Sequence, residues 1–240
     1  MSKITRRGYI PTDEKEFKGD NLNKLYKSSE DLVYLLNRGY KIKAASTFIG
    51  NHYLLSERQR LALVRGVSKY DDIIKRKSKE IIDNSSIQVV YIDGFNTIIT
   101  LEVALSNSLI IKSMDGTIRD LAGLRGTYSV IDKTEVAIKL IGEFLLENNI
   151  PKAIFYLDKP VSNSGRLKMK ILDILEVTAL QIEVENIDNV DSVLKSKENV
   201  VSSDAIILDN CISWINLNKY IIDKKISNNN YIDFSKLNKW

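Results

Sequence analysis

The stretch VVYIDGFN at residues 89–96 is an apolar run that ends in an acid, a glycine and an amide. It predicts a buried strand that stops at Asp93. Similar runs are IQVVYID (87–93), SLIIKSM (108–114), AIFYLD (153–158), LQIEVEN (180–186) and NVVSSD (199–204). The helices between them are expected near residues 97–106, 132–149, 164–178, 189–197 and 211–223. Apolar strands that alternate with helices predict an α/β fold with a mostly parallel sheet covered on both faces.

The first third of the chain has a different pattern. From Asn21 to Lys79 the apolar residues fall at helical spacing, without a sustained two-residue alternation. Ser56 and Ser29 are expected N-caps, because each is followed by acidic residues and then by an apolar helical run. The sequence therefore predicts a small all-α domain at residues 1–86, followed by the α/β domain at residues 87–240.

Composition excludes several kinds of site. The chain of 240 residues has one cysteine, Cys211, and one histidine, His52, so neither a disulfide framework nor a Cys/His zinc site is available. No glycine-rich strand-to-helix turn of the P-loop or dinucleotide type occurs, and a Ser/His/Asp hydrolase would depend on His52 alone. The N-terminus lacks the apolar segment of a signal peptide. A cytoplasmic protein is expected.

Charge is distributed unevenly along the chain. Residues 1–86 carry 18 Lys and Arg against 11 Asp and Glu, whereas residues 87–240 carry 17 against 20. The net charges of +7 and −3 allow the first part to meet a polyanion and the second to hold a cation, although solvated surfaces explain both values equally well. Arg58, Arg60 and Arg65 cluster on one expected helix, as a solvated face or as a phosphate-binding surface.

Polar residues follow the ends of the expected strands. They are Asp93, Asp158, Asn186 with Asp188, Asp191 at the start of the next helix, and Asp204. Any one of them is explained as a helix N-cap or turn residue. Because ligands of parallel sheets bind beyond the carboxyl ends of the strands, together they predict a cluster of carboxylates. Such a cluster needs a cation, and its hard oxygen ligands suit Mg²⁺ or Mn²⁺.

Two other segments are candidate phosphate contacts. The segment DKPVSNSGR is either an anion-binding helix start or a capped helix that follows a turn. The residues that would contact phosphate are Lys159, Ser162, Asn163, Ser164 and Arg166. In SLIIKSMDGTIRDLAGLRGTY (108–128), ion pairs within the segment are the first interpretation and a place in the cleft is the second; the residues are Asp115, Arg119, Asp120 and Arg125.

IDGFN (92–96), Asp191 in NVDSVLK and VVSSD (200–204) resemble, in order and spacing, the motifs of the PIN-like nucleases of the NYN type. The resemblance covers residues 87–212 and implies a three-layer α/β/α fold and metal-dependent cleavage of RNA. It also implies that Asp93, Asp191 and Asp204 bind the metal, that Asn96 orients Asp93 or a water, and that Asp158 is an additional acid of the site.

One departure from these motifs keeps a second function open. Ile206 stands where NYN enzymes often have another acid, and the next acid is Asp209. A PIN-like module without catalytic activity, which binds RNA or another protein, is therefore the alternative. The whole chain also resembles an uncharacterised archaeal and bacterial family, domain of unknown function 434, with a helical N-terminal part. The sequence leaves open whether the chain forms a homodimer.

Overall fold

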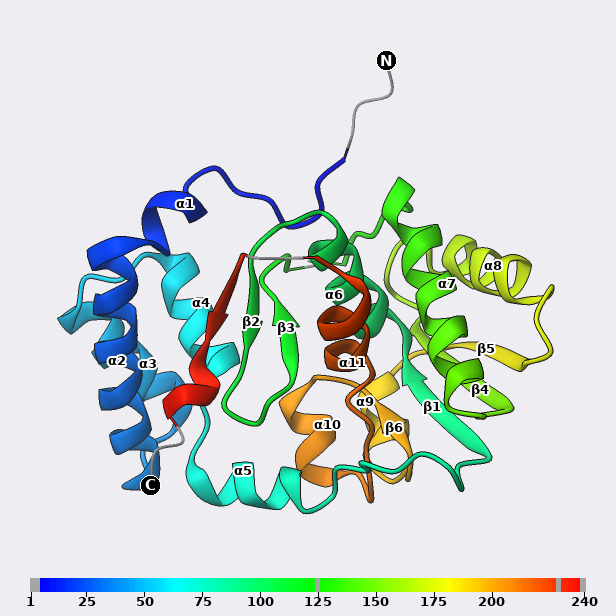
Figure 1. The fold of residues 1–240 in the computed structure, drawn as a ribbon. Coiled ribbons are helices and arrows are strands. Elements are labelled where there is room, and N and C mark those ends of the chain that lie inside the picture. Colours follow the sequence, from blue (N-terminus) through cyan, green and yellow to red (C-terminus); the bar gives the residue numbers. More distant parts are fainter. Residues whose placement is uncertain (1–4, 124–125, 228–229, 238–240) are drawn as a thin grey trace.

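The computed structural model describes residues 5–123, 126–227 and 230–237. The helices are α1 (Asp13–Glu16), α2 (Gly19–Asn37), α3 (Ile42–His52), α4 (Glu57–Gly66), α5 (Tyr70–Lys77), α6 (Gly94–Leu105), α7 (Asp132–Glu147), α8 (Ser164–Leu175), α9 (Val190–Leu194), α10 (Ala205–Asn210), α11 (Leu217–Lys225) and the 3-10 helix η1 (Phe234–Leu237). The strands are β1 (Val89–Asp93), β2 (Ile110–Lys112), β3 (Ile118–Asp120), β4 (Lys152–Asp158), β5 (Gln181–Ile187), β6 (Val200–Val201) and β7 (Tyr231–Asp233). Helices α1 to α4 lie on one side of the molecule and β1, β4 and β5 on the other (Figure 1). The protein is thus a mixed α/β structure with a helical N-terminal region.

The predicted parallel sheet is confirmed for β1, β4, β5 and β6. Its strand order is β5-β4-β1-β6, and every neighbouring pair is parallel. Asp93 at the end of β1 lies beside Tyr156 of β4, two residues before that strand ends at Asp158. The carboxyl ends of these strands therefore meet at one edge of the sheet, as the sequence predicted.

The prediction for SLIIKSM is wrong in one respect, because β2 belongs to a second sheet with the order β3-β2-β7. After β2 the chain turns at Gly116, whose φ is +91°, and returns as the antiparallel strand β3. A parallel neighbour would have required a crossover helix, which this short connection does not provide. Strand β7 then pairs with the other side of β2 in parallel.

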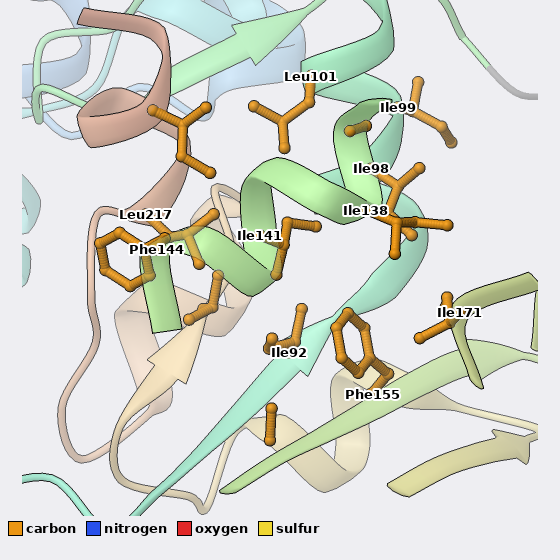
Figure 2. Packing of buried hydrophobic residues seen from close by; sticks show 14 of the residues in the cluster. Ile92, Ile98, Ile99, Leu101, Ile138, Ile141, Phe144, Phe155, Ile171 and Leu217 are labelled. Carbon is orange, nitrogen blue, oxygen red and sulfur yellow. The ribbon is translucent and has the colours of Figure 1, made fainter. Parts of the chain in front are cut away.

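Apolar side chains cover both faces of the parallel sheet. On one face, Ile92 of β1 and Phe155 of β4 pack in a cluster with α6 and α7, including Ile98 and Ile138 (Figure 2). On the other face, Tyr156 packs in a second cluster with side chains of α9, α10 and the segment after α10, among them Leu194, Leu208 and Trp214. Burial on both faces explains why β1 and β4 are almost continuously apolar, whereas the edge strand β5 (QIEVENI) alternates apolar and polar residues and is more exposed.

The helical region shares its core with the second sheet. Leu25, Leu32 and Leu63 of α2 and α4 cluster with Ile111 of β2 and Phe234 of η1. Figure 1 shows β7 and η1 between α2 and β2, although they follow α11 in the sequence. The division of the chain at residue 86 stays a prediction, and hydrophobic contacts join the two parts.

The two expected N-caps have different outcomes. Ser56 caps α4, since its side chain accepts a hydrogen bond from the backbone N–H of Gln59, whose side chain in turn accepts from Ser56 N–H. The prediction for Ser29 is wrong, because α2 begins ten residues earlier at Gly19 and the Ser29 hydroxyl donates to Tyr26 O within the helix. Within the described residues, none of the helices is both long and apolar enough to cross a membrane.

Candidate functional site

A pocket with a volume of about 820 Å³ opens at the carboxyl edge of the parallel sheet; we name it the edge pocket. From the sheet edge its lining includes Phe95, Asn96, Asp158, Ser203, Asp204 and Ile206. From the helical region its lining includes Tyr40, Lys41, Ile42, Val64, Arg65 and Lys69. The volume lies in the range of ligand sites, roughly 300–1,000 Å³.

Asp93 lies beneath this edge with only 7% of its surface exposed. It ends β1 and caps α6, because its Oδ1 accepts a hydrogen bond from Asn96 N–H at 3.4 Å. Its Oδ2 accepts from the Ser202 hydroxyl at 2.8 Å. Burial, and after it the charges of Asp204 and Asp158, raise the pKa of Asp93 to about 7, against the lowering effect of the Ser202 bond.

Gly94 is required by packing rather than by the turn. A Cβ atom at this position would lie 2.5 Å from Leu157 Cδ2 and 3.1 Å from Tyr156 O of β4. Contacts this short force neighbouring atoms apart, and one of the two is a backbone oxygen that cannot rotate away. The glycine in VVYIDGFN therefore lets the start of α6 approach β4 closely.

The side chain of Asn96 does not hold the Asp93 carboxylate, so the first of the two roles that the resemblance implied is wrong, and orientation of a water stays a prediction. Its Oδ1 accepts hydrogen bonds from Ser203 N–H at 2.9 Å and from the Ser203 hydroxyl at 2.8 Å. The amide thus joins the beginning of α6 to the loop that follows β6. The orienting contact to Asp93 comes instead from Ser202, a residue that the sequence interpretation did not single out.

Asp204 ends the loop after β6 and caps α10. Its Oδ1 accepts hydrogen bonds from Ile206 N–H at 2.7 Å and Ile207 N–H at 3.2 Å. The Ser202 hydroxyl, which donates to Asp93, also accepts from Asp204 N–H at 3.0 Å. Ser202 therefore connects the two candidate metal-binding acids, and the serines of VVSSD are the sequence signal that could have identified it.

Asp158 and Asp191 extend the acidic edge. Asp158 ends β4, and its Oδ1 accepts from Val190 N–H at 3.4 Å, where α9 begins. Burial raises its pKa. Burial also raises the pKa of Asp191, in the first turn of α9, and the charges of Asp204 and Asp158 add to this effect. Along the described chain, none of the four acids forms an ion pair with a basic side chain.

The donor chemistry fits a hard divalent cation, since carboxylate and hydroxyl oxygens surround the edge. In the part of the chain that the structure describes, however, no three acidic, histidine or cysteine side chains stand in a ready-made metal-binding group. Mg²⁺ usually keeps several waters and binds through one or two carboxylates. Asp158 and Asp204 line the edge pocket, and Asp93 is joined to Asp204 through Ser202, whose hydroxyl occupies Asp93 Oδ2.

The DKPVSNSGR segment forms a turn in which Ser162, Asn163 and Ser164 make side-chain hydrogen bonds within the protein. The Ser162 hydroxyl accepts from Tyr128 N–H at 3.2 Å, and Asn163, at a φ of +62°, donates to Tyr128 O at 2.6 Å. Ser164 is buried, and its hydroxyl accepts from Asn186 Nδ2 at 3.1 Å. Lys159 and Arg166 are exposed. The expected turn is present, but the expected cap is not, because the N-cap residue Asn163 makes no side-chain hydrogen bond to the start of α8. Phosphate binding by this segment stays a prediction.

For the segment at residues 108–128, ion pairs within the segment were expected first, and Arg119 forms such a pair with Asp115. Its Nη2 donates to Asp115 at 2.7 Å, and Arg76 Nη1 donates to the same carboxylate oxygen at 2.8 Å. Burial alone would raise the pKa of Asp115, but the two guanidinium groups hold it well below its usual value. Arg76 also donates two hydrogen bonds to Asp209, from Nε to Oδ1 at 2.7 Å and from Nη2 to Oδ2 at 3.1 Å. This pair connects α5 to α10. Arg125 lies outside the described residues.

The arginines of α4 also have partners within the protein. Arg58 pairs with Asp13, and Arg60 donates to Leu55 O and to Asn51. Arg65 pairs with Asp120 at 3.3 Å and contributes to the lining of the edge pocket. Only the last of these three arginines therefore lies where it could meet a ligand of the edge pocket.

Residues 82–220 match the family described as Domain of unknown function (DUF5616), which covers more than half of the chain. This chain belongs to the DUF5616 family. The helical residues 24–79 match a second family, Protein of unknown function (DUF434), so the resemblance expected for the whole chain applies to this part. An uncharacterized protein of Methanocaldococcus jannaschii is 39% identical over 184 residues, which are 76% of this chain and 88% of that protein. No solved structure matches this DUF5616 protein.

All four acids of the sheet edge lie within the residues that match DUF5616. Some lining residues of the edge pocket lie outside that match. Tyr40, Lys41 and Lys69 lie in the DUF434 region. Both regions of this DUF5616 protein thus contribute to the lining of one pocket.

Proposed function

We propose that this protein is a PIN-like ribonuclease that hydrolyses RNA phosphodiester bonds with Mg²⁺ or Mn²⁺ at the edge pocket. One observation carries the proposal: Asp93, Asp158, Asp191 and Asp204 gather at one sheet edge without a basic partner at ion-pair distance in the described chain. Unneutralised carboxylates repel one another and oppose folding unless a cation balances them. The α/β part is then a three-layer PIN-like domain that follows the helical region near residue 86.

The residues have separate roles in this proposal. Asp93 and Asp204 would hold the cation, with Asp158 and Asp191 beside it. When bound, such a cation supplies an activated water and stabilises the charge that develops on the phosphoryl group. Ser202 orients Asp93 through its hydroxyl, and Asn96 fixes the adjacent loop through Ser203.

Cleavage of labelled RNAs by the purified full chain in Mn²⁺, Mg²⁺ or EDTA tests the proposal. Asp93→Asn and Asp204→Asn should each abolish cleavage in Mn²⁺ while the circular dichroism spectrum stays unchanged. Asp173→Asn is the matched control, because Asp173 is an acid of α8 that does not line the edge pocket. Equal cleavage by wild type and Asp93→Asn, or cleavage that persists in EDTA, would contradict the proposal.

A specific observation favours the second candidate, a PIN-like RNA-binding or protein-interaction module without catalysis. Ile206, at the position where NYN enzymes often have an acid, lines the edge pocket and is 53% exposed. Asp209 does not replace that acid, because both of its oxygens are held by Arg76. RNA binding in EDTA, combined with no cleavage of any RNA in Mn²⁺ and no Mn²⁺ binding by calorimetry, would support this function instead.

A further inference from the structure

The acidic sheet edge cannot by itself attract RNA, because its charges repel phosphates. If the proposed function is correct, affinity for the substrate must come from other residues of the edge pocket. Much of the remaining lining comes from the helical region, and it includes residues 39–42 of the turn between α2 and α3, within the sequence RGYKIK (38–43). Arg119 and Asp120 of β3 also line the pocket, but both form ion pairs. Figure 1 shows this helical region on the side of the molecule away from β4 and β5.

Two side chains of this turn are presented to the pocket. Tyr40 is 59% exposed and lines the pocket, as does Lys41 next to it. Lys41 has no carboxylate partner at ion-pair distance among residues 5–123, 126–227 and 230–237, whereas Lys69 pairs with Asp72 at 3.4 Å and Arg65 with Asp120 at 3.3 Å. Within the described part of the chain, the charge of Lys41 is therefore not neutralised by an ion pair.

Apolar surface surrounds these two residues. Ile42 and Val64 also line the pocket and are 36% and 43% exposed. Single exposed apolar residues are common on protein surfaces. Here an aromatic ring, two aliphatic side chains and a lysine without an ion pair in the described chain line the same pocket. An aromatic platform beside a positive charge is the arrangement that binds single-stranded nucleic acid, by base stacking and by phosphate contact.

We infer that the helical region forms the substrate-holding wall of the edge pocket, with Tyr40 stacking on a base of single-stranded RNA and Lys41 contacting the adjacent phosphate. This inference rests on the proposed function and adds to it the residues that hold the substrate. A paired base would not reach Tyr40, because its faces are covered by its neighbours in the duplex. The wall therefore distinguishes single strands from duplexes by access to a base face.

Fluorescence anisotropy of a labelled RNA of about 12 nucleotides, measured with the full chain in EDTA, tests binding without cleavage. Tyr40→Ala should weaken binding of the single strand by about 5-fold to 100-fold, and Tyr40→Phe should retain it. Lys41→Ala should reduce the slope of log affinity against log salt by about 0.7, the value for one phosphate contact to a single strand. The same sequence as a duplex should bind wild type more weakly and be insensitive to Tyr40→Ala.

Matched controls separate the wall from general surface effects. Tyr34 has almost the same exposure as Tyr40, 58% against 59%, but does not line the pocket, and Lys43 is an exposed lysine two residues from Lys41 that also lies outside the lining. Tyr34→Ala and Lys43→Ala should bind like wild type. Unchanged binding by Tyr40→Ala, equal loss in Tyr34→Ala, or no binding of the single strand by wild type would each overturn the inference.

Failure of the proposed function gives a different result. If binding of single-stranded RNA depends on Tyr40 but the RNA is never cleaved in Mn²⁺, the inference about the substrate-holding wall is supported and the nuclease proposal fails. If RNA is cleaved in an Asp204-dependent manner and Tyr40→Ala binds it normally, the nuclease proposal stands and the inference fails.

Discussion

The substitution Asp93→Asn should change how stability depends on pH. The pKa of Asp93 is about 7 in the folded protein, against 3.8 for an unperturbed aspartate, the value that represents the unfolded chain. Between these values the folded state retains a proton that the unfolded state has lost. The free energy of unfolding of the wild type therefore falls as pH rises through this window and levels off above it. An asparagine has no proton to lose, so the variant lacks this term.

The magnitude follows from the two pKa values. Each pKa unit corresponds to about 1.4 kcal/mol. Ionisation of Asp93 therefore lowers the free energy of unfolding of the wild type by about 1.5 kcal/mol near pH 5 and by about 4 kcal/mol above roughly pH 8. The difference in unfolding free energy between variant and wild type should thus grow by about 3 kcal/mol from pH 5 to pH 9. Constant effects of the substitution, such as an altered bond to Ser202, cancel in this comparison.

Urea unfolding of both proteins in EDTA, at several pH values, measures this difference. Asp173→Asn serves as the control and should follow the wild type. Added Mn²⁺ should restore stability to the wild type above pH 7 and leave Asp93→Asn unchanged, because a cation favours the ionised carboxylate. Parallel pH profiles for wild type and Asp93→Asn would refute the electrostatic reasoning about the acidic edge.

Three further substitutions test other parts of the structure. Gly94→Ala should lower the free energy of unfolding by about 1–3 kcal/mol in urea, because the new Cβ atom would meet Leu157 at 2.5 Å, while Gly165→Ala, with no atom within 4 Å, should not destabilise the protein. Asp115→Asn should cost about 3–5 kcal/mol at pH 7, since it leaves two buried arginines without their shared acid. Because the pKa of Asp115 is lowered by folding, this difference should shrink only as pH falls below about 4. Ile206→Asp should tighten Mn²⁺ binding in calorimetry without loss of stability, since the side chain is exposed at the start of α10; unchanged Mn²⁺ affinity would count against a cation site at this edge.

The sequence predicted the parallel sheet and its acidic edge because both depend on local patterns. Apolar runs and the acids that end them lie within a few residues of one another, and the parallel arrangement follows from the helices between them. The ends of β1, β4, β5 and β6 accordingly meet where Asp93, Asp158 and Asp204 were expected.

What the sequence could not predict depends on contacts between distant residues. The pairing of β7 with β2, 121 positions apart at Ile110 and Tyr231, leaves no local signal. The partners of Arg76 are also distant in the chain, since Asp115 is 39 positions away and Asp209 is 133 positions away. The contact of Ser202 with Asp93 was missed because a serine has many interpretations, and only the fold brings it beside the carboxylate.

The insertion of Phe234 into the helical core has a consequence for synthesis of the protein on the ribosome. A Cβ at Gly66 would lie 2.1 Å from the Phe234 ring, which shows how closely this residue fits between α4 and its neighbours. Chains are made from the N-terminus, and a nascent domain usually folds once its own residues have emerged. Here Ile232 and Phe234 belong to the core of the helical region, so that core is complete only after the α/β part has been translated.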